Sequence, residues 1–199
     1  MSFEAFAVST GVVALGEMGD KTQLLALLLV ARWRQPWTIA AGILVATLAN
    51  HAGAAALGSV ISTLVTRWLS PEVMRWLLGL SFIAVALWML KPDDAGEEVE
   101  GAGTGRWGVF GLTVIAFFLA EMGDKTQIAT VMLAARFDAP VVVTAGTTLG
   151  MMLANAPALW LGDALLKRVP IQWVHRIAAV VFLSLGAAVL LGLPSGLGE

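Results

Sequence analysis

The stretch 17–23 reads Glu-Met-Gly-Asp-Lys-Thr-Gln, and the same seven residues return at 121–127. Each copy lies deep inside an apolar stretch. Two carboxylates and a lysine are costly to bury in the middle of a membrane-length segment, so such groups are candidates for function. The repeat indicates a chain of two similar halves that bring matching charged groups to one place.

Composition places the chain in a membrane. Of its 199 residues, 58% are hydrophobic and 13% charged, with a mean hydropathy of +0.84, whereas a soluble domain carries about 25% charged residues. We therefore predict an all-α integral membrane protein. A net charge of −2 and the lack of a dense basic run argue against nucleic acid as a partner. The absence of cysteine excludes disulfides and thiolate metal sites, and we expect no bound cofactor.

Apolar segments of about 20 residues or more predict transmembrane helices. Six can be drawn, at 3–31, 38–66, 73–90, 107–135, 141–166 and 177–193. Uncharged residues flank both motifs, so a rise of ~1.5 Å per residue places each motif near the middle of the membrane.

Landmarks outside the motif also repeat. Ala31-Arg32 matches Ala135-Arg136 and Pro36 matches Pro140 at the same offset as the motifs. We predict two three-helix repeats, 1–91 and 107–199, joined by an acidic cytoplasmic linker at 92–106. Three spans per repeat is an odd number, so the second repeat would be inverted. Inverted repeats are typical of secondary transporters, whose sites lie between the repeats near the midplane.

Basic residues predict the orientation. Those near the predicted span ends divide into seven on one side (Arg32, Arg34, Lys91, Arg106, Lys167, Arg168 and Arg176) and three on the other (Arg67, Arg75 and Arg136). The side richer in Lys and Arg is expected to be cytoplasmic. Both termini would then lie outside.

On a continuous helix, Glu17, Asp20 and Lys21 would share one face. Gln23 would flank that face, and Thr22 would point away toward a preceding carbonyl. Gly19 allows close approach and local unwinding. The second motif repeats this arrangement with Glu121, Gly123, Asp124, Lys125, Thr126 and Gln127.

The two motif faces are expected to meet across the repeat axis. The metal ligands would be four carboxylates, those of Glu17, Asp20, Glu121 and Asp124. Oxygen ligands select hard divalent cations, namely Ca²⁺, Mn²⁺ or Mg²⁺. Four carboxylates and two ammonium groups sum to −2, which one divalent ion neutralises. A buried carboxylate needs a cation or a proton, so the cluster suggests cation/proton exchange.

Other polar groups near the motifs have two interpretations. Lys21 and Lys125 would compensate charge in the empty site, or would only pair with the glutamate four residues earlier. Gln23, Gln127, Asn50 and Asn155 are candidate ligands or gate residues, and interhelical hydrogen bonding fits them equally well. We expect His51 to be hydrogen-bonded between helices rather than to bind metal.

The doubled Glu-Met-Gly-Asp-Lys-Thr at 17–22 and 121–126 resembles the Glu-x-Gly-Asp-Lys/Arg-Ser/Thr signature of the transmembrane protein 165 family. The resemblance covers both motifs and the three-plus-three layout. It implies a cation/proton antiporter for manganese or calcium, and we expect manganese export across a bacterial plasma membrane. It also implies that the four acidic residues bind the cation and that Thr22 and Thr126, with Gly19 and Gly123, support the motif.

Two other functions fit parts of the pattern. Asp20 and Asp124 could form the dyad of an intramembrane aspartyl protease, but that function leaves the copied glutamates and lysines unexplained. An exporter of a non-metal cationic solute shares the six-span layout, yet four acids with few other polar contacts favour a metal ion. The same oxygens bind Mn²⁺ and Ca²⁺, so both stay candidates, and no residue pattern indicates an oligomeric state.

Overall fold

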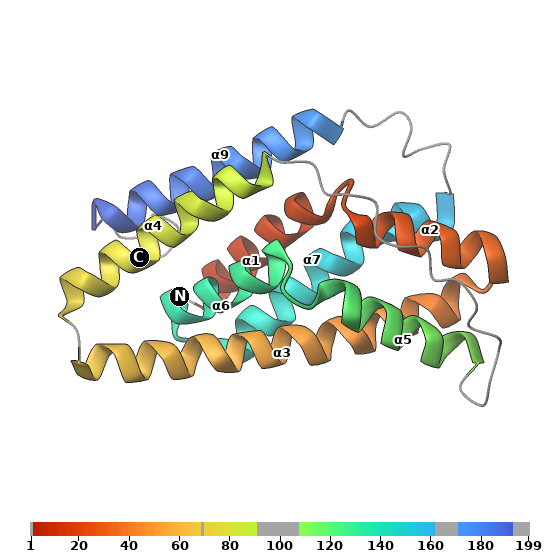
Figure 1. The fold of residues 1–199 in the computed structure, drawn as a ribbon, viewed down its shortest axis with the longest axis horizontal. Coiled ribbons are helices and arrows are strands. Elements are labelled where there is room, and N and C mark those ends of the chain that lie inside the picture. Colours follow the sequence, from red (N-terminus) through yellow and green to blue (C-terminus); the bar gives the residue numbers. More distant parts are fainter. Residues whose placement is uncertain (1, 69, 91–107, 162–170, 193–199) are drawn as a thin grey trace.

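The computed structural model describes residues 2–68, 70–90, 108–161 and 171–192 (Figure 1). Every regular element in these ranges is a helix, which confirms the predicted all-α class. The helices are α1 (Ser2–Glu17), α2 (Lys21–Trp33), α3 (Pro36–Trp68), α4 (Pro71–Met89), α5 (Gly108–Glu121), α6 (Lys125–Phe137), α7 (Pro140–Leu161) and α9 (Ile171–Leu190).

Each motif interrupts its predicted span. The segment 3–31 is two helices, α1 and α2, and the segment 107–135 is α5 and α6. The prediction that each motif lies on a continuous helix is therefore wrong. The backbone turns left-handed at Gly19 (φ 83°) and Gly123 (φ 75°), a conformation that glycine adopts without steric penalty and that commonly ends a helix.

Three of the described helices are long and apolar enough to cross a membrane alone. They contain the stretches Pro36–Leu64, Pro71–Trp88 and Pro140–Leu161, which lie in the segments predicted as the second, third and fifth spans. Two further apolar stretches, Gly108–Glu121 and Arg176–Leu190, are shorter. The lengths and the composition of these helices thus support a membrane protein. The arrangement of six spans as inverted repeats stays a prediction.

Glycines bring matching helices of the two halves into close contact. A Cβ built on Gly146 of α7 would lie 2.7 Å from the carbonyl oxygen of Phe6 on α1. A Cβ on Gly42 of α3 would lie 3.1 Å from the carbonyl oxygen of Phe110 on α5. These four residues are counterparts in the repeat, so α1 packs on α7 as α5 packs on α3. Helices α3 and α7 also pack on each other.

Helices α4 and α9 form a pair of their own and lie side by side in Figure 1. A Cβ on Gly186 would lie 2.9 Å from the carbonyl oxygen of Gly79, so the backbones approach closely. The rings of Phe82 and Phe182 lie 6.2 Å apart in the same contact. Small residues that permit such approach are the usual basis of helix association in membranes.

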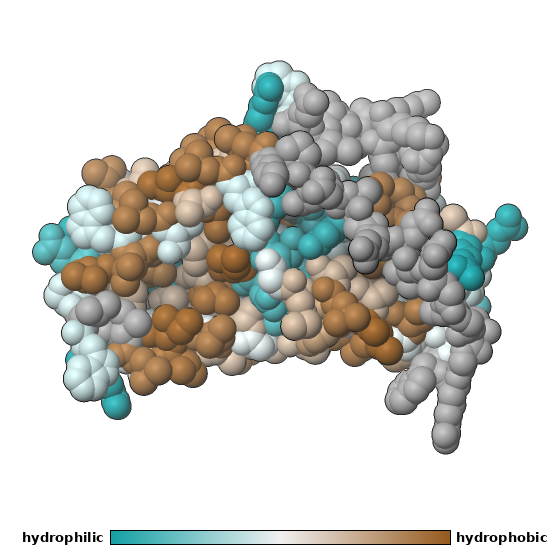
Figure 2. Space-filling model, viewed as in Figure 1, coloured by the Kyte–Doolittle hydropathy of each residue, from teal (hydrophilic) through white to brown (hydrophobic). Residues whose placement is uncertain are grey.

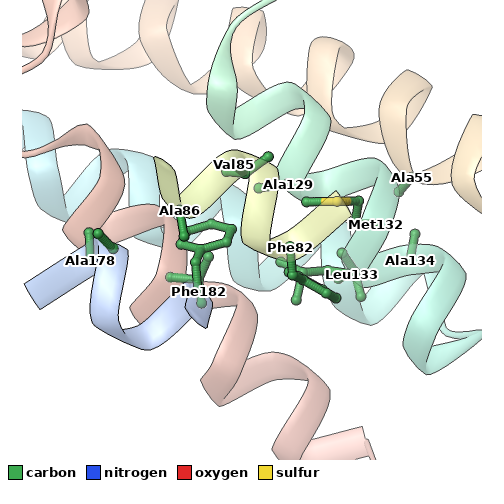
Figure 3. Packing of buried hydrophobic residues seen from close by; sticks show 13 residues of the cluster. Ala55, Phe82, Val85, Ala86, Ala129, Met132, Leu133, Ala134, Ala178 and Phe182 are labelled. Carbon is green, nitrogen blue, oxygen red and sulfur yellow. The ribbon is translucent and has the colours of Figure 1, made fainter. Parts of the chain in front are cut away.

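Two buried hydrophobic clusters divide the molecule. The first, which we call the α4–α9 core, joins those two helices to α1, α3, α6 and α7 through residues such as Val85, Ala129 and Phe182 (Figure 3). The second, the α2–α5 core, joins α2 and α5 to α1, α3 and α7 and includes Leu29 and Phe117. Among the side chains of α4 and α9 that the structure describes, none belongs to the α2–α5 core.

Candidate cation-binding centre

The two helix breaks bring three carboxylates together. One oxygen from each of Glu17, Glu121 and Asp124 can be chosen so that all lie within 4.8 Å of one another. Glu17 ends α1, Glu121 ends α5, and Asp124 is the N-cap of α6. All three side chains are buried. Both halves of the chain therefore supply this oxygen cluster, as the repeat led us to expect.

Asp20, the fourth predicted ligand, lies beside the cluster but is not one of its three members. It is the buried N-cap of α2. Its carboxylate is close enough to interact electrostatically with Lys21 and with Glu121. Asp20 thus contributes negative charge to the centre.

Threonine hydroxyls orient both glutamates. Thr22 Oγ1 donates to Glu17 Oε2 at 2.7 Å, and Thr126 Oγ1 donates to Glu121 Oε2 at 3.3 Å. The expectation that Thr22 points away is wrong, because the break turns α2 so that its first residues face the end of α1. The other oxygens, Glu17 Oε1 and Glu121 Oε1, are buried and have no hydrogen-bond partner among the described residues. Such unpaired acceptors fit a cation.

The motif lysine of the first half pairs across the repeat. Lys21 Nζ lies 3.0 Å from Asp124 Oδ1, with side-chain exposures of 26% and 5%. Simple pairing of Lys21 with Glu17 along one helix is therefore not what the structure shows. Lys125 is buried. The Lys21 contact places a positive charge on one of the three clustered carboxylates.

The motif glutamines brace the breaks. The amide oxygen of Gln23 accepts from the Gly19 N–H at 2.9 Å, and that of Gln127 accepts from the Gly123 N–H at 2.7 Å. Their amide nitrogens reach the opposite half: Gln23 Nε2 donates to the Ala154 carbonyl at 2.6 Å. Gln127 Nε2 donates to the side-chain oxygen of Asn50 at 2.7 Å. Each amide thus binds the backbone of its own break through its oxygen and the opposite half through its nitrogen.

The remaining candidates differ between the halves. Asn50 bonds across helices to Gln127, whereas Asn155 Nδ2 donates within its own helix to the Met151 carbonyl at 3.1 Å. His51 is fully buried, and neither ring nitrogen has a hydrogen-bond partner among the described residues. The expectation of a hydrogen-bonded interhelical histidine is therefore wrong.

One buried acidic residue, Glu4, was not predicted from the sequence. Glu4 lies in the first turn of α1 and its side chain is only 5% exposed. At the sequence level it is a single charge at the edge of an apolar run, with Gly108 at the matching position of the second half. Nothing in that pattern distinguishes it from a solvated helix end.

Helix ends of both polarities meet at the centre. The carboxyl ends of α1 and α5 carry partial negative charge, which favours a cation. The amino ends of α2 and α6 carry partial positive charge, which stabilises the carboxylates of their N-caps, Asp20 and Asp124. Hydrophilic residues also gather at the middle of the face in Figure 2, between two largely hydrophobic regions. Acidic oxygens at paired helix breaks inside an apolar helical protein are what a membrane transporter of cations requires.

Comparison with known proteins places the chain within that class. The profile described as "Divalent cation/proton antiporter GDT1" matches residues 5–97 and 109–195. The chain belongs to the GDT1 family of divalent cation/proton antiporters. It is accordingly an integral membrane transporter and not an enzyme, so the aspartyl protease interpretation is wrong. The resemblance to a cation/proton antiporter family is confirmed.

Curated relatives agree over nearly the whole length. A Vibrio cholerae protein named "Putative manganese exporter" is 47% identical over 92% of this chain and 88% of its own length. A GDT1-like protein of Synechocystis is 29% identical over 89% of this chain and 92% of its own length. GDT1-like protein 4 of Oryza sativa subsp. indica is 28% identical over 91% of this chain and 71% of its own length. No solved structure matches the chain.

Proposed function

We propose that this antiporter exports Mn²⁺ from the cytoplasm in exchange for protons, and that Glu17, Glu121 and Asp124 bind the ion with Asp20 close by. The observation that carries the proposal is the buried cluster of three carboxylate oxygens within 4.8 Å. The similarity to the manganese exporter named above supports Mn²⁺ among the divalent cations. The ligand atoms that these three residues offer are all oxygens, as this hard cation prefers.

Charge neutrality is the physical basis of the exchange. The four motif carboxylates and the two motif lysines together carry a charge of −2 when all are ionised. One divalent ion or two protons neutralise that charge equally well. A buried site tolerates neither an excess nor a deficit of charge, so the arrival of metal displaces protons and the arrival of protons displaces metal.

Lys21 has a specific part in this exchange. In the empty site its ammonium group occupies Asp124 Oδ1. A divalent ion that binds Asp124 has to displace the ammonium group. Because the Lys21 side chain is 26% exposed, its ammonium group can then move toward solvent. When the ion leaves, Lys21 returns and keeps Asp124 paired. Thr22 and Thr126 bind Oε2 of Glu17 and Glu121, which leaves Oε1 of each glutamate for the ion.

The repeat architecture is part of the proposal. We infer six spans, in which α1–α2 and α5–α6 each form one broken span, arranged as inverted repeats at 1–91 and 107–199. The family profile matches two separate stretches, one in each half. Local geometry repeats as well, since Arg34 and its counterpart Asp138 both end their helices at positive φ, 53° and 47°. The linker at 92–106 lies outside the described residues.

Membrane orientation follows from the basic residues. With the seven-residue side in the cytoplasm, the end at which α2 finishes is cytoplasmic, and the end at which α1 begins and α6 finishes is external. Both termini would be outside. Similarity to a Vibrio cholerae protein supports a bacterial inner membrane as the location.

Transport assays on reconstituted protein test the proposal. In proteoliposomes with a pH gradient we expect Mn²⁺ flux above that of Ca²⁺ or Mg²⁺, coupled to opposite movement of protons. Glu17→Gln and Asp124→Asn should each reduce Mn²⁺ flux at least ~100-fold, since each removes one of three ligands and its charge. Glu72→Gln is the matched control, because Glu72 is exposed and pairs at 4.0 Å with Arg75, outside the carboxylate cluster.

Two results would contradict the proposal. One is Mn²⁺ flux that does not depend on the pH gradient and moves no protons. The other is full flux in both site variants. A preference for Ca²⁺ would keep the exchange mechanism and overturn the choice of substrate.

A further inference from the structure

The α4–α9 pair packs against one end of the molecule only. Helix α4 contacts α6, and α9 contacts α1. Among the described residues, contacts of either helix with α2 or α5 are at most marginal. In Figure 1 the pair lies toward the side where α6 ends, away from α2 and α5.

This placement breaks the symmetry of the repeat. Exchanging the two halves turns a contact of α4 with α6 into a contact of α9 with α2. It likewise turns a contact of α9 with α1 into a contact of α4 with α5. A molecule with equal halves thus has two equivalent positions for the pair, and the structure occupies one. The α4–α9 core closes that end, whereas the α2–α5 core is formed without the pair.

A polar contact fastens the pair at the occupied position. Arg136, in the last turn of α6, donates from a guanidinium nitrogen to the Leu185 carbonyl of α9 at 3.4 Å. Glu4 of α1 attracts the same guanidinium electrostatically. Arg136 of α6 is therefore hydrogen-bonded to α9 and attracted electrostatically to the acid of α1.

The other position lacks the complete contact. The counterpart of Arg136 is Arg32, which is exposed and lies over the ring of Trp33 at 4.7 Å. The counterpart of Glu4 is Gly108, which has no side chain. A pair displaced toward α2 and α5 would find a cation there but no acid beside it.

We propose that the α4–α9 pair is the moving gate of the antiporter and that Arg136, together with Glu4, latches it against α1 and α6. The inference rests on the proposed function, because it names the elements that open the carboxylate cluster to each side. The structure is then the state in which the pair closes the external end of the molecule.

Disulfide cross-linking can detect both positions, since the chain has no native cysteine. The double variant Val85→Cys/Ala129→Cys joins α4 to α6 within the α4–α9 core. By the repeat, its counterpart is Leu185→Cys/Leu25→Cys, which would join α9 to α2. In the structure Leu185 packs on the α4–α9 core and Leu25 on the α2–α5 core, so the two lie in different clusters.

We expect the first cross-link to form readily in membranes without metal and to stop Mn²⁺ flux until it is reduced. The second should form slowly, and faster when Mn²⁺ and a pH gradient drive turnover. Flux that continues through the oxidised Val85–Ala129 cross-link would overturn the inference. So would an active Leu185–Leu25 variant that never cross-links during turnover.

Latch variants test Arg136 separately. Arg136→Gln, added to the Leu185→Cys/Leu25→Cys variant, should raise its cross-linking rate roughly tenfold, as expected for loss of a charge-assisted hydrogen bond. Glu4→Gln, which removes only an electrostatic attraction, should raise the rate less. Arg136→Lys should restore much of the slow rate, which a merely structural defect would not. Arg32→Gln is the matched control and should change nothing. An equal effect of Arg32→Gln and Arg136→Gln would refute the latch.

The two proposals fail in different ways. Absence of Mn²⁺ flux in the unmodified protein would refute the proposed function whatever the cross-links show. Normal flux with a fixed α4–α9 pair would leave the function standing and refute the gate.

Discussion

The hydroxyl of Thr22 decides which oxygen of Glu17 is available to an ion. It donates to Glu17 Oε2 and leaves Oε1 buried and unpaired. Groups that orient a ligand without touching the metal commonly change metal affinity 10–100-fold. At the scale of single residues, the centre therefore depends on hydroxyls as well as on carboxylates.

Thr22→Val should weaken Mn²⁺ binding about tenfold or more, because the isosteric side chain cannot donate to Glu17. Titration calorimetry on detergent-purified protein would measure the change, and Thr22→Ser should restore most of the affinity. Thr63→Val is the control, since Thr63 is exposed and its hydroxyl bonds the Ser59 carbonyl of its own helix. Unchanged affinity in Thr22→Val would show that the hydroxyl does not position the ligand.

At the scale of elements, α1 and α7 are held together by close backbone contacts at glycines rather than by large side chains. Helices α1 and α7 approach at Gly146 and Gly150, where an added Cβ would lie 2.7 Å from the Phe6 carbonyl oxygen and 2.6 Å from the Thr10 carbonyl oxygen. Backbone cannot move aside as a side chain can. These contacts fix α1 and hence the depth at which Glu17 ends it.

Gly146→Ala should destabilise the protein by about 1–3 kcal/mol, the usual effect of overpacking, and lower its apparent unfolding temperature in detergent. Gly11→Ala is a matched control in α1, because a Cβ there meets nothing within 4 Å. That control should be neutral or slightly stabilising, since alanine is the better helix former. Equal behaviour of the two variants would show that the α1–α7 contact adapts.

The sequence predicted the helical class and the segments that contain the three long apolar helices, because hydrophobicity and length are local signals. It did not predict the helix breaks. The spacing of Glu17, Asp20 and Lys21 suits a continuous helix, and the break is stabilised by the bond from Gly19 N–H to Gln23. The ion pair between Lys21 and Asp124 was not predicted either, because it joins residues that lie far apart in the sequence, in different halves.

At the scale of the whole molecule, the charge of the centre belongs to both halves together. Glu17 comes from the first half, whereas Glu121 and Asp124 come from the second. Counting the two carboxylates and the one lysine of each motif, each half carries −1, so neither half alone can neutralise a divalent ion in a buried site. Proton release on metal binding is therefore a property of the assembled chain.

Mn²⁺ binding should release about two protons per ion, because the neutral empty site carries two protons in place of the metal. The sign follows directly: a lower pH supplies the competitor and weakens binding, and a higher pH strengthens it. A two-proton competition changes the apparent Kd up to ~100-fold per pH unit. Calorimetry in buffers of different ionisation enthalpy measures the proton count, and a Kd that is the same at all pH values would exclude proton competition.

Matching motifs at both helix breaks also bear on ancestry. Each glutamate, threonine, glutamine and glycine of the first break has a counterpart at the second, and the α1–α7 contact has its counterpart in α5–α3. A half-length ancestor that inserted in both orientations could have built the same centre from two copies. After gene duplication and fusion, each copy was free to diverge. Glu4, opposite Gly108, marks a place where the halves have diverged and where a direction of transport could be favoured.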